Sequence, residues 1–158
     1  MGNITTDPAS CAAANEIVKA RFYYTIEQNG LTKPWHGHVF LNPPYSPGMM
    51  PLFMNKLYEE IKKGNTLQAV VITNAQTAAK WFQKALKKSS AVCFPGKRIS
   101  FIDGGTMEEK KGNDRSQAIF YFGKKGEDFA DEFSDVGEIL VKLKDGFSLH
   151  KCTGACHA

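Results

Sequence analysis

Val39-Phe40-Leu41-Asn42-Pro43-Pro44-Tyr45 is the segment from which we derive the architecture of this chain. Its apolar run predicts a buried strand, and the prolines end that strand, because each proline fixes its own φ and restricts the residue before it. The run that follows, Leu52-Phe53-Met54-x-x-Leu57-Tyr58-x-x-Ile61, has the apolar spacing of a helix. The predicted order is therefore strand, loop, helix, and in open α/β sheets such a loop lies at the edge where ligands bind.

On both sides of this segment, apolar strands alternate with helical patterns. The first helix should begin at Ser10 as its N-cap, and the helix after the proline loop should end at Gly64. After Glu127 the sequence fits either one more helix or a pair of strands. Expected strands cover residues 4–7, 22–25, 39–41, 67–73, 91–94, 98–101 and 117–123, with a turn at Pro95-Gly96, and expected helices cover 11–20, 51–63 and 77–88. This order predicts an α/β fold with a mostly parallel sheet, a central parallel strand at 67–73 and an antiparallel C-terminal edge.

The length of 158 residues predicts one domain. We expect this domain to cover residues 1–150 and residues 151–158 to form a disordered tail. The net charge of +4 permits a polyanionic partner. The sequence contains no apolar run long enough to cross a membrane and no secretory signal, so we expect a cytoplasmic protein without a membrane partner.

The histidines and cysteines do not predict a metal site. The first histidine pair has no carboxylate or cysteine close to it in the sequence, so these two histidines are expected in a turn. The tail places four candidate ligands within eight residues, a spacing that matches no usual zinc finger. The residues considered are His36 and His38, and His150, Cys152, Cys156 and His157 in the tail.

An ordered set of short motifs runs from about residue 2 to about residue 123. The set consists of Asp7-Pro8-Ala9-Ser10, Asn15, Tyr24-Thr25, Gly30-Leu31, Pro34-Trp35, Gly37, Asn42-Pro43-Pro44-Tyr45, Arg98-Ile99-Ser100-Phe101 and Gly123. In these motifs the chain resembles the phage-type N6-adenine DNA methyltransferases, the Dam-like family of phages and prophages. The resemblance implies a Rossmann-like methyltransferase fold, S-adenosylmethionine (SAM) as the cofactor, double-stranded DNA as the partner, and the cytoplasm of a bacterial host as the location.

The resemblance implies that Asn42, Pro43, Pro44 and Tyr45 form the catalytic loop. An adenine amino group is a poor nucleophile, because its lone pair is delocalised into the ring. The Asn42 side-chain oxygen and the next backbone carbonyl can each accept one N–H bond, which favours a more tetrahedral nitrogen and stabilises the transition state more than the ground state. Tyr45 would supply an aromatic face for a base flipped out of the helix. Without its flanking strand and helix, this tetrapeptide would equally fit a tight turn.

The resemblance also assigns the SAM site. It implies that the first loop takes the place of the glycine-rich turn of most methyltransferases, with a helix N-terminus behind it. Members of the family often have Asp where Asn29 stands. They usually begin with an aromatic-x-Thr-Pro segment that touches the methionine end of SAM, and we expect this chain to lack that segment, with a consequence for SAM affinity. The implied cofactor residues are Asp7, Pro8, Ala9, Ser10, Asn29, Gly30 and Asn42.

Basic residues near the end of the resemblance are candidates for DNA contacts. Phosphate groups are bound by Lys and Arg side chains, although each such residue by itself also fits an ordinary solvated surface. Residues 103–116 form a long polar segment with glycines at 104 and 105, and our hypothesis is that it closes over DNA. The candidate DNA-binding residues are Lys97, Arg98, Lys110, Lys111 and Arg115.

Three alternatives remain open at this point. Methylation of cytosine N4 needs the same kind of planar amine, although those enzymes usually have Ser at the position of Asn42. Methylation of a glutamine N5 in a release factor uses the same tetrapeptide, in enzymes with a glycine-rich SAM loop and an extra helical domain. A degenerate module could keep the fold and bind SAM or DNA without turnover. Transfer of a methyl group from SAM distinguishes the enzymes from the degenerate module, and the methyl acceptor distinguishes the enzymes from one another.

Overall fold

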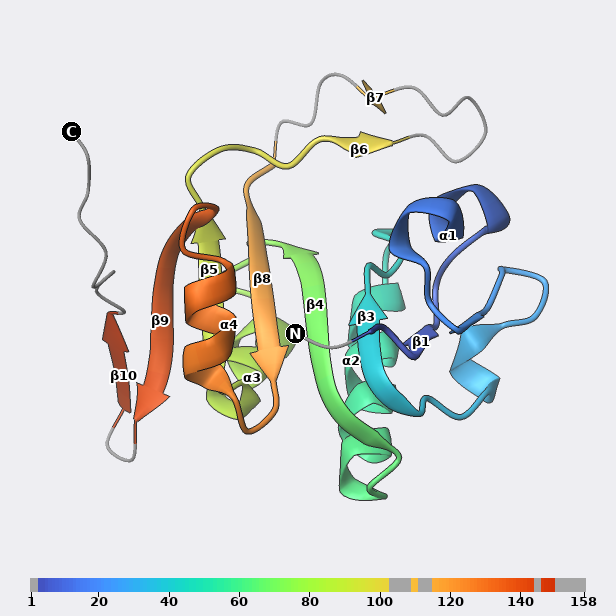
Figure 1. The fold of residues 1–158 in the computed structure, drawn as a ribbon, viewed down its shortest axis with the longest axis horizontal. Helices are drawn as coiled ribbons and strands as arrows, with labels where there is room; N and C mark the ends of the chain where they lie inside the picture. Colours follow the sequence, from blue (N-terminus) through green and yellow to red (C-terminus); the bar gives the residue numbers. More distant parts are fainter. Residues whose placement is uncertain (1–2, 103–108, 111–114, 144–145, 150–158) are drawn as a thin grey trace.

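The computed structural model describes residues 3–102, 109–110, 115–143 and 146–149, and it shows an α/β fold built on one large sheet (Figure 1). Eight strands of the described residues form this sheet in the order β10-β9-β5-β8-β4-β3-β1-β2. The strands are β1 (Thr6–Asp7), β2 (Phe22–Tyr23), β3 (Gly37–Leu41), β4 (Thr66–Asn74), β5 (Ala91–Pro95), β8 (Gln117–Phe122), β9 (Gly137–Leu143) and β10 (Gly146–Leu149). The helices are α1 (Ala12–Val18), η1 (Gly30–Thr32), α2 (Met49–Lys62), α3 (Lys80–Lys88) and α4 (Gly126–Glu132).

The sheet is parallel in one half and antiparallel in the other. Strands β2, β1, β3 and β4 run parallel. In contrast, β8 is antiparallel to both β4 and β5, and β9 is antiparallel to both β5 and β10. The prediction of a mostly parallel sheet with only an antiparallel edge is therefore wrong in its extent. The reason is that β8, whose residues are all buried, lies between β4 and β5 and pairs with each of them.

Helices cover both faces of the sheet (Figure 1). On one face, Leu57 of α2 and Phe82 of α3 join Val71 of β4 in the main apolar cluster, and all three side chains are fully buried. On the other face, Phe129 of α4 stacks on Tyr121 of β8 with ring centroids 5.2 Å apart. The first of these clusters also contains Leu41, the last residue of β3, so it supports the parallel half of the sheet where the proline loop begins.

The ends of the helices follow their capping contacts. The predicted N-cap at Ser10 is wrong, because α1 begins after Cys11, whose Sγ accepts the Ala14 backbone N–H at 3.4 Å. The Ser10 N–H donates instead to the Tyr24 carbonyl at 2.9 Å, which links the loop after β1 to the end of β2. The predicted helix end at Gly64 is confirmed: α2 stops two residues earlier and Gly64 has a φ of +78°.

Between β5 and β8, two short strands among the described residues form a separate sheet above the large one (Figure 1). In it, β6 (Phe101–Ile102) pairs antiparallel with β7 (Glu109–Lys110). The predicted turn at Pro95-Gly96 is shifted by one residue, because Pro95 still belongs to β5 and the chain bends at Gly96 and Lys97. Of the strand predicted at 98–101, only Phe101 lies in a strand, β6. The loop hypothesis for residues 103–116 falls largely outside the described residues, as does the tail from residue 150. For the chain after Glu127 the sequence fitted either a helix or a pair of strands, and the structure contains both, the helix α4 and the strand pair β9–β10.

No helix among the described residues has the length and apolar character needed to span a bilayer.

A buried carboxylate joins α2 to the start of β3. Glu60 is 1% exposed and accepts bonds from Lys56 Nζ at 2.8 Å, Asn65 Nδ2 at 2.8 Å and the Trp35 N–H at 3.2 Å. Burial by itself raises the pKa of this carboxyl, but these partners outweigh burial and lower the pKa to about 2. The charged form of Glu60 is therefore favoured in the folded protein.

We expect Glu60→Gln to remove part of the acid sensitivity of this fold. Because the folded pKa lies below the ordinary value of 4.5, charged Glu60 contributes stability above pH 4.5 and loses it as the pH falls toward 2. The variant should be less stable than the wild type at pH 7, by on the order of 3 kcal/mol. Urea unfolding at pH 7, 5 and 3 measures the difference, which should shrink at pH 3. An equal difference at all three pH values would contradict this role.

Candidate active site

The proline loop follows directly from β3 and carries two polar side chains in contact. The Tyr45 hydroxyl lies 3.0 Å from Asn42 Oδ1 and 3.4 Å from the Ile72 carbonyl, so its proton is shared between two acceptors. Burial raises the pKa of Tyr45, so the phenol stays protonated and acts as a donor. Pro43, within the loop, is buried. The Asn42 carboxamide is therefore held on a rigid backbone and oriented by its neighbour.

The loop after β1 lies at the same sheet edge, because β1 and β3 are parallel neighbours. Asp7 is 3% exposed, and its Oδ1 accepts the Ala9 N–H at 3.2 Å. Burial raises the pKa of Asp7. The hydrogen bond from the Ala9 N–H opposes this rise, and so does the nearby Ser10 hydroxyl, although that hydroxyl makes no hydrogen bond of standard geometry. The Asp7 carbonyl in turn accepts the Tyr24 N–H at 3.0 Å. The hydrogen bonds of Asp7 therefore fix the conformation of the loop that follows β1.

Gly30 brings a second loop against the first. A Cβ on Gly30 would lie 2.0 Å from the Pro8 carbonyl oxygen, so only glycine fits there. The Gly30 carbonyl accepts the Trp35 indole N–H at 2.8 Å, and Trp35 is fully buried. Asn29, just before it, adopts a φ of +49°. The two predicted cofactor segments thus meet at this glycine.

An apolar cavity of about 360 Å³ opens where these loops meet. Of the predicted site residues, Pro8, Ala9, Ser10, Asn29, Gly30 and Pro44 line it. Neither Asp7 nor Asn42 is part of the lining. The lining residues that sequence analysis did not assign to the site are Tyr24, Thr25, Ile26, Ser46, Met49 and Phe53.

Part of this lining had a signal in the sequence. Tyr24 and Thr25 follow β2, which is parallel to β1, and the carboxyl ends of parallel strands meet at one edge. Met49 and Phe53 lie in α2 and could not be distinguished from ordinary core residues of an amphipathic helix. The lining is mostly apolar with a few polar groups, as is common for small-molecule sites.

We expect Gly30→Ala to weaken ligand binding in this cavity. The added methyl group must push the Pro8 carbonyl away, and both residues line the cavity. The affinity for SAM, which the resemblance implies as the ligand, should fall about tenfold or more, as for a misplaced binding loop. Isothermal titration with SAM measures this effect. Gly48→Ala is a control at another glycine, where a Cβ would meet nothing within 4 Å although its φ of +80° strains any other residue. Equal affinities for Gly30→Ala and the wild type would contradict the close-approach argument.

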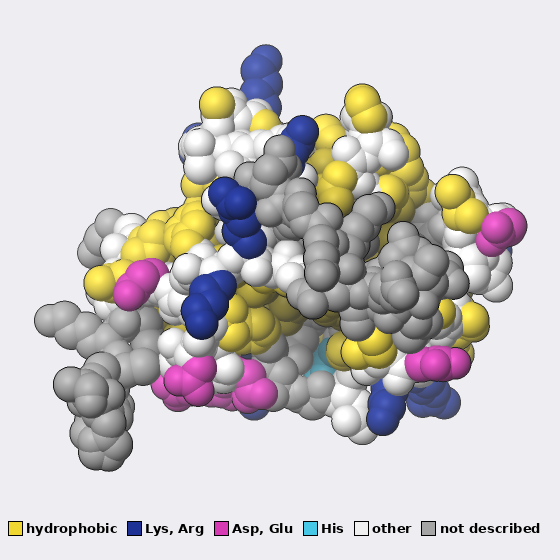
Figure 2. Space-filling view, turned by 90° about the horizontal axis from the view of Figure 1, so that it is seen from above, with side chains coloured by type: hydrophobic (Ala, Val, Ile, Leu, Met, Phe, Trp, Pro, Cys, Tyr) yellow, Lys and Arg dark blue, Asp and Glu magenta, His cyan; other side chains and the backbone are white. Residues whose placement is uncertain are grey.

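Three predicted DNA-binding residues lie at the edge where β3 and β4 end. Lys97 and Arg98 follow β5, which points the same way as β4, and Arg115 precedes the antiparallel β8. All three are exposed, and Figure 2 shows Lys and Arg side chains on this face of the molecule. Lys110 belongs to β7, where only the backbone is described, and Lys111 lies outside the described residues.

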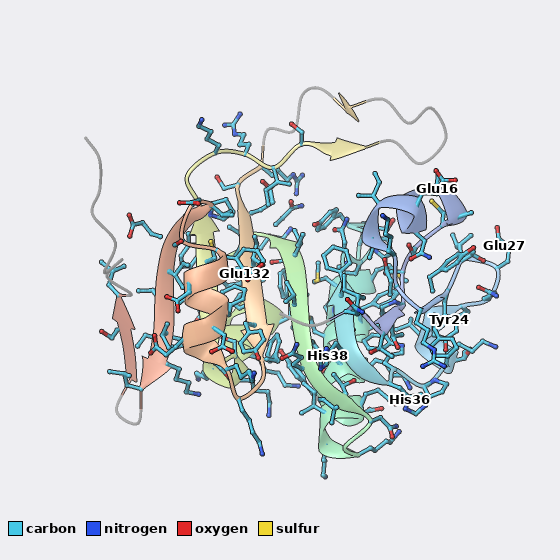
Figure 3. The ribbon with its side chains drawn as sticks, viewed as in Figure 1. Glu16, Tyr24, Glu27, His36, His38 and Glu132 are labelled. Carbon is cyan, nitrogen blue, oxygen red and sulfur yellow. The ribbon has the colours of Figure 1, made fainter. Side chains whose placement is uncertain are left out.

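The histidine pair does not form a turn. His38 lies within β3, and its backbone N–H is 3.2 Å from Thr5 Oγ1, so the expectation for His38 is wrong. His36 precedes the strand and is exposed, and Figure 3 shows the two side chains at separate positions. Within the described ranges, no group of three or more His, Cys, Asp or Glu side chains is arranged to hold a metal ion. The tail ligands lie outside those ranges.

The comparisons with known proteins agree on one family. Residues 7–137 match the family model described as DNA N-6-adenine-methyltransferase (Dam). The DNA N-6-adenine-methyltransferase of Haemophilus phage HP1 (strain HP1c1) is 30% identical over 125 residues, which are 78% of this chain and 70% of that protein. The DNA N-6-adenine-methyltransferase of Escherichia phage T1 is 26% identical over 153 residues, which are 85% of this chain but only 63% of the relative. No solved structure matches this chain significantly.

Proposed function

This chain belongs to the DNA N-6-adenine-methyltransferase (Dam) family, and from this we propose that it uses Asn42-Pro43-Pro44-Tyr45 to direct a methyl group from SAM to the N6 amino group of adenine in double-stranded DNA. The names of both relatives favour adenine over cytosine or glutamine as the acceptor. Because both relatives come from phages, we place the activity in the cytoplasm of a bacterial host. The main support for the proposal is the position of the loop, which follows β3 directly and forms one wall of the apolar cavity.

The residues present fit SAM. Gly30 leaves no space between its backbone and that of Pro8, so both loops present backbone rather than side chains to the cavity at this point. The apolar lining suits an adenosine group, and Asn29 adds a polar group to the same lining. When bound, SAM supplies an activated methyl group, which is the demanding part of the chemistry. The chain itself has to bind and orient the two substrates and to exclude water from them.

Asn42 is proposed to bind the adenine amino group. Its Oδ1 and the Pro43 carbonyl are acceptors on a backbone that two prolines hold in place. Hydrogen bonds from N6 to these acceptors favour a tetrahedral nitrogen, whose lone pair is then directed at the methyl carbon. Acceptors fixed before the reaction cost no reorganisation in the transition state. The methylated nitrogen carries a positive charge, and it returns to neutral by releasing one proton to solvent water.

Tyr45 has two proposed roles, one for its ring and one for its hydroxyl. The residue is 39% exposed, and its ring would offer an aromatic face to a flipped base. The hydroxyl donates to Asn42 Oδ1, which has a second lone pair for the adenine N–H. The hydroxyl therefore orients the acceptor without occupying it completely.

We expect Tyr45→Phe to lower kcat about three- to tenfold, the equivalent of one typical net hydrogen bond. The Phe ring keeps the aromatic face, so KM for DNA and the affinity for SAM should change little. Steady-state kinetics with both substrates separate these effects. Tyr45→Ala is the matched variant, which should also raise KM for DNA. An unchanged kcat in Tyr45→Phe would contradict the orienting role.

The test of the function is transfer of a radiolabelled methyl group from SAM to double-stranded DNA without adenine methylation. The DNA is then hydrolysed, and its nucleosides are separated. Label in N6-methyladenine supports the proposal. Label in N4-methylcytosine, or none in DNA while SAM binds, would overturn it. The exposed Lys97 and Arg98 are proposed phosphate contacts, and their contribution should appear as salt dependence of KM for DNA.

A further inference from the structure

One buried carboxamide joins the two stretches of chain that lead to and from the small β6–β7 sheet. Gln117 is the first residue of β8 and is 3% exposed. Its Oε1 accepts the Ile99 N–H at 3.0 Å, and its Nε2 donates to the Arg115 carbonyl at 2.5 Å. Both ends of this amide are therefore bonded to backbone, one partner on each side of the small sheet. A buried amide that is satisfied in this way holds its partners at a defined spacing.

Each partner of Gln117 is backbone that belongs to an arginine. The Ile99 N–H is part of the peptide group that joins Arg98 to Ile99. The other partner is the carbonyl of Arg115 itself. Both arginine side chains are exposed. The Gln117 carboxamide thus fixes the backbone of two arginines, from two separate stretches of the chain, relative to each other.

Gln117 is itself held at the end of the large sheet. It pairs with Asn74, the last residue of β4. The carbonyl of Ser116 accepts the Ala75 N–H at 2.8 Å, which continues the link to β4 beyond the strand. Ile99 is half-buried and packs against the apolar cluster on the α4 side of the sheet. The backbone of both arginines therefore has a fixed place on the sheet edge.

The same edge carries the proline loop. The Tyr45 hydroxyl lies 3.4 Å from the carbonyl of Ile72, which precedes Asn74 by two positions in β4. From the rise of a strand and the spacing of neighbouring strands, the backbone of Gln117 lies roughly 10 Å from that of Ile72. This distance corresponds to about three base-pair steps of DNA. The arginines can therefore reach the backbone of a duplex whose target base lies at the proline loop.

We propose that Gln117 is a positioning residue for DNA, which sets the spacing of Arg98 and Arg115 so that both guanidinium groups contact the phosphate backbone of the same duplex. The inference rests on the proposed function, since it names how the DNA of that reaction is held. A guanidinium group binds phosphate through a planar fork of donors, so its position matters more than that of an ammonium group. The carboxamide is buried, and it acts on DNA only through the two arginines.

Binding of a fluorescently labelled duplex tests this role without turnover. Gln117→Met keeps the length of the side chain and removes both hydrogen bonds. The variant should raise Kd for DNA about three- to tenfold, the equivalent of one typical net hydrogen bond. The slope of log Kd against the logarithm of the salt concentration should become shallower by about one, as for the loss of one phosphate contact.

Gln68→Met is the matched control. Its carboxamide also belongs to the large sheet, near the opposite end of β4, and its Oε1 accepts the Tyr121 hydroxyl at 2.9 Å. The control should lower Tm about as much as Gln117→Met does and leave both Kd for DNA and its salt dependence unchanged.

A second set of variants shows whether Gln117 acts through the arginines. Arg98→Gln combined with Arg115→Gln should raise Kd more than Gln117→Met does and should flatten the salt slope by about two. In this background Gln117→Met should have no further effect, because no guanidinium group is left to position. With the arginines present, Gln117→Met should raise KM for DNA and leave kcat and SAM affinity unchanged. If Gln117→Met does not fold, Gln117→Glu gives the same test, since it keeps the acceptor for Ile99 and loses the donor to Arg115.

The outcomes separate this inference from the proposed function. Wild-type Kd in Gln117→Met, or an equal loss with and without the two arginines, would overturn the positioning role and leave the function standing. A lower kcat at unchanged KM would also overturn it. Duplex binding that depends on Gln117 and on both arginines, in a protein that transfers no methyl group to adenine, would support the positioning role and overturn the function.

Discussion

Asn42→Ala is expected to lower kcat for methyl transfer at least about a hundredfold, the scale on which a single fixed hydrogen-bond partner contributes to a transition state. The substitution removes the Oδ1 acceptor that Tyr45 orients at 3.0 Å. Asn42 does not line the larger cavity, so SAM affinity should be nearly unchanged. Transfer of labelled methyl groups under saturating SAM and DNA measures the effect.

Two further variants make the Asn42 result interpretable. Asn42→Asp keeps an oxygen acceptor and should retain more activity than Asn42→Ala. Asn55→Ala removes an exposed asparagine of α2 that accepts a bond from Lys84, and it should leave kcat unchanged. If Asn42→Ala transfers methyl groups at the wild-type rate, the loop is not the catalytic element.

Trp35→Ala is expected to cost about 3–5 kcal/mol of unfolding free energy, as for other buried aromatic residues. Trp35 is fully buried and stacks on Phe53 of α2 with ring centroids 6.0 Å apart. Its indole N–H also holds the Gly30 carbonyl at 2.8 Å. SAM affinity should therefore fall together with stability, because Gly30 and Phe53 both line the cavity. Urea unfolding and SAM titration at a temperature where the variant is folded measure the two effects.

Trp35→Phe provides the control for this prediction. It keeps an aromatic ring against Phe53 and loses the bond to the Gly30 carbonyl, so its cost should be smaller, roughly 1–3 kcal/mol. If Trp35→Ala lowers the unfolding free energy by less than about 1 kcal/mol, the prediction is wrong, because neighbouring side chains then fill the space of the indole ring.

The alternation of strands and helices could be predicted from the sequence because it depends on local constraints. The apolar runs at β3, β4 and β8 and the glycine after α2 produced the correct elements within one or two residues. The position of β8 could not be predicted in this way. Its continuous apolar run fits any buried strand, and only its two partners decide that it lies between β4 and β5.

The candidate site could likewise be predicted only in part from the sequence. The motif order indicated the loops at Asp7–Ser10, Asn29–Gly30 and Asn42–Tyr45, and the structure brings all three to one sheet edge. Met49 and Phe53 carried no such signal. Apolar residues of an amphipathic helix look like ordinary packing residues until the tertiary structure shows the cavity that they line.

The sequence alone therefore determined the rigid proline loop and its place after a buried strand, since two prolines and an apolar run act within a few residues. Only the tertiary structure decided which distant residues face that loop. That choice depends on strand order and on the packing of α2 and α3 against the sheet, which local sequence patterns do not encode.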